Sequence, residues 1–85
     1  MQRQGKFFKS LIAKEYLFVL YEKESKDSFT ICMLRFVHST LSTKTTVYDS
    51  NTRFENYYEE VSKDSVPADF LVAIKSVESS LSKAR

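Results

Sequence analysis

Three segments rich in apolar, aromatic and β-branched residues follow one another through the middle of the chain, and they constrain its fold most. They are residues 16–21, 29–37 and 43–48. Side chains of these kinds fit a pleated, half-buried sheet surface and are unfavourable in a solvated helix. Short polar runs, residues 24–28 and 38–42, connect the segments. Because parallel neighbours need a long crossover, connections this short predict three adjacent antiparallel strands.

The alternation of side chains along each predicted strand indicates which faces of the sheet are apolar. In the first segment Tyr16, Phe18 and Leu20 point to one face, and equally apolar residues between them point to the other. The third segment is more polar, and its Lys44 is typical of an edge strand because lysine discourages edge-to-edge association. Since a chain this short can cover one face with its own helices, we expect a partner to cover much of the other.

The spacing of apolar residues changes from that of a strand to that of a helix outside this central region. The apolar residues from Phe54 to Val61 recur at i, i+3, i+4 and i+7, which predicts one face of a helix. Pro67 suits the first turn of a further helix, whose apolar positions include Phe70 and Ile74. Residues 7–12 contain a shorter version of the same spacing.

These patterns predict one α+β domain over residues 1–85. We expect a small three-stranded antiparallel β-meander, a short N-terminal helix, and one kinked or two C-terminal helices packed on one face. Residues 1–5 are predicted to form a flexible arm.

The scarcity of reactive side chains argues against an enzyme or a metalloprotein. His38 is the only histidine and Cys32 the only cysteine, and six residues of strand separate them by about 20 Å. Zinc requires three or four ligands, and a single glycine cannot build a glycine-rich phosphate loop. We therefore expect no catalytic residue, no metal, no cofactor and no small-molecule substrate.

The cysteine content and the lack of a long apolar run predict a cytoplasmic location. A lone cysteine forms no disulfide within the chain and is typical of a reducing compartment. We interpret Cys32 as a small buried hydrophobe, with a reactive thiol as the alternative. No stretch approaches the roughly 18 apolar residues that span a bilayer, so we expect no membrane partner.

The basic side chains suggest RNA as one partner. The net charge is +2, and residues 1–14 and 35–44 contain basic residues but no acidic ones. This charge permits nucleic-acid binding without requiring it. RNA-binding sheets stack bases on aromatic rings and hold phosphates with nearby lysine or arginine. The candidate RNA-binding residues are Lys9, Lys14, Arg35, His38, Lys44 and Arg53.

The apolar sheet surface suggests a protein as the other partner, either a second copy or a different subunit. The candidate interface residues are Tyr16, Phe18, Leu20, Phe36 and Tyr48. Two hypotheses follow. The chain is either an oligomerising subunit that presents basic residues to structured RNA in a ribonucleoprotein, or a small homodimeric or adaptor domain that binds no nucleic acid.

Three short runs resemble the fourteen-kilodalton Alu-domain subunit family of the signal recognition particle: residues 33–35, 43–47 and 54–58. That family has a leucine-arginine strand, a lysine-Ser/Thr-Thr-Val strand, and a helix that opens with phenylalanine and has tyrosine four residues later. The resemblance implies an α-β-β-β-α fold, a heterodimer formed through the sheet, and Alu RNA bound by basic residues, here Arg35 and Lys44. The family's long basic loop is reduced here to residues 24–28, which include two acidic residues.

Overall fold

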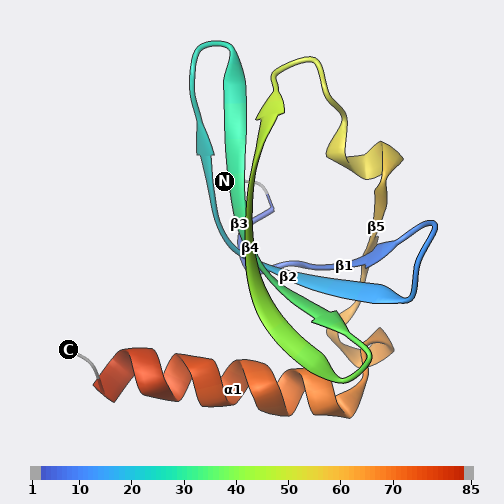
Figure 1. Ribbon diagram of the computed structural model, residues 1–85, viewed down its shortest axis with the longest axis vertical. Helices are drawn as coiled ribbons and strands as arrows, with labels where there is room; N and C mark the ends of the chain where they lie inside the picture. Colours follow the sequence, from blue (N-terminus) through green and yellow to red (C-terminus); the bar gives the residue numbers. More distant parts are fainter. Residues whose placement is uncertain (1–2, 84–85) are drawn as a thin grey trace.

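An antiparallel sheet and one α-helix form the fold. The computed structural model describes the backbone of residues 3–83 and the side chains of residues 3–78. The described chain contains β1 (Phe7–Ser10), β2 (Glu15–Glu24), β3 (Ser28–Val37), β4 (Thr40–Asp49), β5 (Tyr58–Val61) and α1 (Ala68–Lys83). Two 3-10 helices, η1 (Phe54–Asn56) and η2 (Lys63–Ser65), flank β5. The strand order is β4-β3-β2-β1-β5 (Figure 1).

The sheet is strongly curved, and its two edge strands, β4 and β5, lie on either side of one concave face (Figure 1). The pairing of β2 with β3 shifts register between Val19 and Tyr21, which marks a β-bulge at Leu20. A bulge bends its strand and increases the local twist. The curvature therefore brings residues from opposite edges of the sheet to the same side of the molecule.

The concave face contains one of two apolar cores. Phe54 of η1 fills its centre and is fully buried. The Phe54 ring lies edge-on to that of Phe8, with centroids 5.0 Å apart, and stacks on that of Tyr58 at 4.7 Å. The other buried members of this core are Leu17, Val19, Phe29, Ile31 and Met33.

The convex face contains the second core, against which α1 packs near the β3–β4 turn (Figure 1). Phe70 of α1 is fully buried and stacks on Phe36 with ring centroids 5.1 Å apart. Its ring also meets Phe7 edge-on at 5.9 Å. The chain thus covers part of both sheet faces with its own residues, one with α1 and the other through curvature and η1.

The predicted three-stranded fold is wrong, although its three strands are present as β2, β3 and β4 within a sheet of five. Residues 7–12 form β1 and a loop rather than a helix. Phe7 and Phe8 are adjacent yet both buried, because β1 lies between β2 and β5 and contributes to both cores. The third predicted strand lies at a sheet edge, as expected.

The predicted C-terminal helices are also corrected. The segment from Phe54 to Val61 is a 3-10 turn followed by β5, which pairs with β1. The described residues therefore contain one C-terminal α-helix, which begins at Ala68, directly after Pro67, whereas the prediction placed Pro67 in its first turn. An α-β-β-β-α order, which the family resemblance implied, is wrong for this chain.

Part of the predicted N-terminal arm bonds to the sheet. Gly5 donates its backbone N–H to the carbonyl of Val19 at 2.9 Å. Gly5 has φ of +78°, a conformation that glycine adopts at little cost, in the turn that leads into β1. Residues 1 and 2 of the predicted arm lie outside the described residues.

Candidate functional site

A groove of about 420 Å³ opens on the concave face between the two sheet edges, and we call it the tyrosine groove. Its volume lies in the range of ligand-binding pockets. The groove is lined by Ser10, Ile12, Lys44, Thr46, Tyr48, Thr52, Tyr57 and Tyr58. Residues 10–12, 44–48 and 57–58 are far apart in the sequence, so the curvature of the sheet creates this site.

Two of the tyrosines are anchored in the concave core. Tyr48 projects from the inner face of β4 and stacks on Phe29, with ring centroids 5.2 Å apart. Tyr58 begins β5 and stacks on Phe54. Both residues are half-buried and pack against the core cluster. The groove therefore has rigid aromatic walls, which reduce the ordering cost of binding.

The two anchored phenols should titrate above the ordinary tyrosine range. Burial raises the pKa of Tyr48 and, likewise, that of Tyr58, because it disfavours the charged phenolate. A phenol whose pKa is higher in the folded state stabilises the fold below the unfolded pKa of about 10 and loses that contribution as pH rises further. We expect alkaline titration of tyrosinate absorbance to show a late component, which Tyr48→Phe and Tyr58→Phe each reduce.

In that titration, a late component whose amplitude is undiminished in both variants would place the perturbed phenols elsewhere. Unfolded protein in denaturant provides the control, since all five tyrosines should then titrate near about 10.

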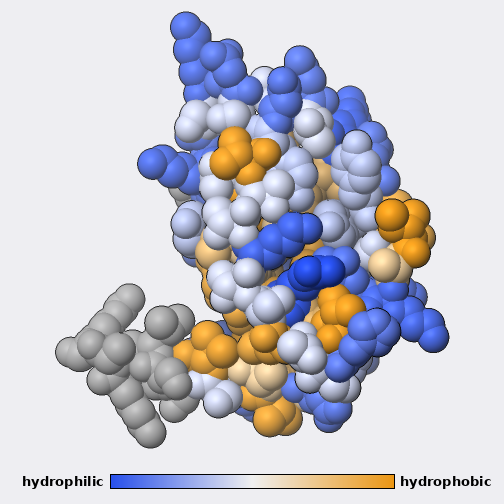
Figure 2. All heavy atoms as spheres, in the orientation of Figure 1, coloured by the Kyte–Doolittle hydropathy of each residue, from blue (hydrophilic) through white to orange (hydrophobic). Residues whose placement is uncertain are grey.

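An exposed apolar loop adjoins the groove. The side chains of Leu11 and Ile12 are 54% and 95% exposed, and neighbouring Tyr57 is 56% exposed. These three form what we call the apolar corner, and they are half of the six large hydrophobic residues described as exposed. Figure 2 shows hydrophobic atoms at the tip of the β1–β2 loop. Clustering of this kind marks an interaction surface more often than scattered exposure does.

Hydrogen bonds hold the apolar corner in place. The Ser10 hydroxyl accepts hydrogen bonds from the backbone N–H groups of Ile12 at 3.3 Å and Ala13 at 3.2 Å. Leu11 donates its N–H to the carbonyl of Tyr57 at 3.1 Å. These bonds hold the backbone of the turn in place, and the turn presents the Ile12 side chain to solvent.

The predicted RNA-binding residues are distributed over different parts of the surface. Lys44 lines the tyrosine groove, and its ammonium forms no ion pair or hydrogen bond within the described part of the chain. Arg35 donates to the carboxylate of Glu15 at 2.9 Å. Lys14 and His38 together line a separate pocket of about 240 Å³ near the start of α1.

The other two predicted basic residues lie outside these pockets. Lys9 is exposed on β1, opposite Glu59 of β5 in the sheet register. Arg53 is exposed before η1. The structure thus groups Lys14 with His38 but does not gather the six residues on one surface.

Four of the five predicted interface residues pack into the convex core beside α1: Tyr16, Phe18, Leu20 and Phe36. The fifth, Tyr48, lines the tyrosine groove. Sequence reasoning missed Ile12, Tyr57 and Tyr58 because it assigned all three to helix faces. Ile12 could have been recognised from the sequence, because it lies in a short connection after a serine. An apolar side chain in such a loop does not pack on the sheet.

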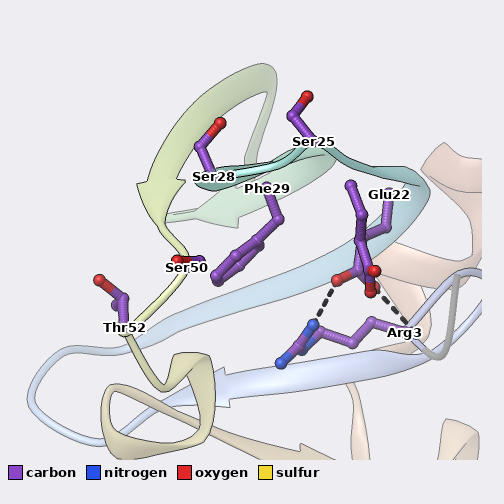
Figure 3. A pocket seen from close by; sticks show the side chains of 8 residues that line it. Arg3, Glu22, Ser25, Ser28, Phe29, Ser50 and Thr52 are labelled. Atoms are coloured by element: carbon purple, nitrogen blue, oxygen red, sulfur yellow. Dashed lines mark hydrogen bonds and ion pairs between the residues drawn. The ribbon is translucent and has the colours of Figure 1, made fainter.

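A polar pocket of about 260 Å³ lies near the β2–β3 loop. Arg3 reaches into it and bonds to the carboxylate of Glu22 (Figure 3). The Arg3 guanidinium also bonds to the carboxylate of Glu55. The hydrogen bond with Glu55 raises the pKa of Arg3 and lowers that of Glu55. Because Arg3 is engaged with both carboxylates within the chain, this cluster is a structural element and a weaker candidate for a binding site.

Comparison of the chain with protein families, curated proteins and solved structures finds no match. The resemblance to the Alu-domain subunit family therefore stays a prediction. Over the part of the chain that the structure describes, no helix has the length and apolarity to cross a membrane. Within the same residues, no three histidine, cysteine or carboxylate side chains are grouped to hold a metal ion.

Proposed function

We propose that this protein is a non-enzymatic binding module that recognises a protein partner through the tyrosine groove and the apolar corner. The observation that carries the proposal is Ile12, which is 95% exposed on a hydrogen-bonded turn at the rim of the groove. Protein interfaces are enriched in tyrosine and depleted in charge at their centres, and buried aromatic anchors supply much of the affinity. The groove has this composition.

The charge distribution favours protein over RNA as the main partner. The groove lining contains one formally charged residue, Lys44. Proteins that bind nucleic acid neutralise several phosphates at once, and their affinity falls steeply with salt. Arg35 is engaged with Glu15, and Lys14 and His38 line a different pocket.

RNA is the second candidate because Lys44 lies beside three tyrosines in the groove. Aromatic rings next to a lysine can stack single-stranded bases and hold a phosphate. This alternative requires the groove to work with fewer cations than most RNA-binding surfaces use. It predicts an affinity for single-stranded RNA that falls with rising salt along a shallow slope, because the slope grows with the number of phosphates neutralised.

Photo-crosslinking from the apolar corner tests the proposal. A photoreactive residue in place of Ile12 should yield a discrete protein adduct in cells that naturally express the chain. The same residue in place of exposed Lys26, in the β2–β3 loop, is the matched control and should not yield that adduct. Tyr57→Ala in the position-12 protein should weaken the adduct.

Two results would contradict the proposed function. Identical adducts from positions 12 and 26 would mean that the corner has no special role. An adduct abolished by ribonuclease would move the conclusion to RNA.

A further inference from the structure

We infer that the partner contributes an extended segment, which adds as a strand to the free edge of β4. One of its apolar side chains then enters the tyrosine groove, and an acidic side chain lies beside Lys44. This inference rests on the proposed function and specifies the chemistry of the partner. Strand addition gains affinity from main-chain hydrogen bonds and specificity from pockets for alternate side chains.

The edge of β4 is long and unpaired within the described chain. Its ten residues pair with β3 on one side, and the strand order places no described strand on the other. Edge strands in stable monomers are commonly short, covered or interrupted, because an open row of N–H and C=O groups invites pairing. β4 contains neither proline nor a register shift against β3, so one lysine, Lys44, is its main protection.

The β3–β4 turn determines which backbone groups of β4 are available. His38 and Ser39 form a two-residue connection in which both have positive φ, 50° and 63°, as in a type I′ turn. Such a turn is closed by a hydrogen-bonded pair, here Val37 and Thr40. Because hydrogen-bonded and non-bonded pairs alternate, the N–H groups of Thr43, Thr45 and Val47 point away from β3.

The added strand would border the tyrosine groove directly. Lys44, Thr46 and Tyr48 point from β4 into the groove, and directly opposed residues of neighbouring strands share a face. Alternate side chains of the added segment therefore enter the groove. The apolar corner lies on the side of the groove opposite β4. An apolar side chain between Tyr48 and Tyr57 would displace water from aromatic surface.

The positive charge of Lys44 predicts an acidic residue in the partner segment. It also argues for a partner other than a second copy of this chain. The Lys44 ammonium has no described ionic partner in a groove otherwise lined by uncharged residues. A carboxylate on the added strand would supply one. The groove-facing residues of β4 itself are Thr40, Ser42, Lys44, Thr46 and Tyr48, so a symmetric β4–β4 pair provides no acid at this position.

Selection of random dodecapeptides displayed on phage against the full chain tests the inference. Selected sequences should share an acidic residue with apolar residues two positions away, since alternate residues face the groove. Lys44→Glu should reduce their affinity by at least about tenfold and change the selected charge to basic.

A proline scan of the edge distinguishes strand addition from other binding modes. Thr45→Pro removes an outward N–H that β3 does not use, and proline is tolerated at such edge positions. It should weaken the selected peptide about tenfold, whereas the control Lys26→Ala, in the exposed β2–β3 loop, should bind normally. If Thr45→Pro fails to fold, single N-methylation along the peptide gives the same information, because strand addition predicts losses at every second position.

The outcomes separate the inference from the proposed function. Full binding by folded Thr45→Pro, or N-methylation losses without a period of two, overturns strand addition. A position-12 adduct with a protein, combined with no selected peptide, overturns it too and leaves the proposed function standing. A purified dimer that Thr45→Pro dissociates assigns the edge to a second copy and also overturns it. If position 12 yields no protein adduct and phage display selects no peptide, both strand addition and the proposed function are overturned.

Discussion

Replacing Phe54 with alanine should lower the free energy of unfolding by about 3–5 kcal/mol. Phe54 is fully buried at the centre of the concave core, where its ring contacts those of Phe8, Tyr48 and Tyr58. The substitution removes apolar area and leaves a cavity that the curved sheet cannot close. A domain of this size has a stability of about 4–13 kcal/mol, so the loss is a large share of the total.

Urea unfolding followed by circular dichroism measures this loss. Phe54→Leu, which retains much of the volume, should cost less, and Tyr57→Ala should cost only about 0.5 kcal/mol because that side chain is exposed. The comparison matters for function because Tyr58 rests on Phe54 at the base of the tyrosine groove. Equal losses from Phe54→Ala and Tyr57→Ala would show that η1 does not hold the concave core together.

The central strands could be predicted from the sequence because their signals are local. β2, β3 and β4 are runs of apolar and β-branched residues joined by short polar turns, and this combination leaves few alternatives to an antiparallel meander. The position of β4 at an edge followed from its polarity and Lys44. Lys44 and Tyr48 are four residues apart, so alternation places them on one face of β4, and both line the tyrosine groove.

The two short strands could not be predicted because their patterns are ambiguous. β1 and β5 have four residues each, too few for a period of two to be told from one of 3.6. Phe7 and Phe8 face opposite cores, so their adjacency resembles a helix face. Phe54 belongs to η1 and is buried, and half-buried Tyr58 belongs to β5 and packs on it, so two different elements imitate an i, i+4 repeat.

The candidate site was only partly predictable because curvature, rather than any local motif, assembles it. Tyr57 and Tyr58 meet Lys44 only when both edges of the sheet border one face. The bulge at Leu20 contributes to this bend, and a bulge leaves little trace in an apolar sequence. The sequence also suggested a surplus of apolar sheet surface, which α1, η1 and the sheet's own curvature largely bury.

Arg3→Met should lower the free energy of unfolding by about 2–3 kcal/mol, because it removes the guanidinium from a buried carboxylate. The side chain of Glu22 is 2% exposed, and Arg3 bonds to it through both its guanidinium and, at 3.2 Å, its backbone N–H. Methionine keeps an apolar stem near Phe29 and Phe54, over whose rings the guanidinium now lies. The expected loss is therefore mainly electrostatic.

Two further variants test that cause. Glu55→Gln removes the exposed partner of Arg3 and should cost less than about 1 kcal/mol. The lowered pKa of Glu55 means that its contribution exists above the unfolded pKa and is lost as pH falls through the folded pKa, so Glu55→Gln should lessen acid sensitivity. Arg3→Met combined with Glu22→Gln should be more stable than Arg3→Met alone, because the buried side chain that has lost the guanidinium is then neutral. If the double variant were less stable than the single one, Arg3 would stabilise the sheet through packing, and the ion pair would have little part in it.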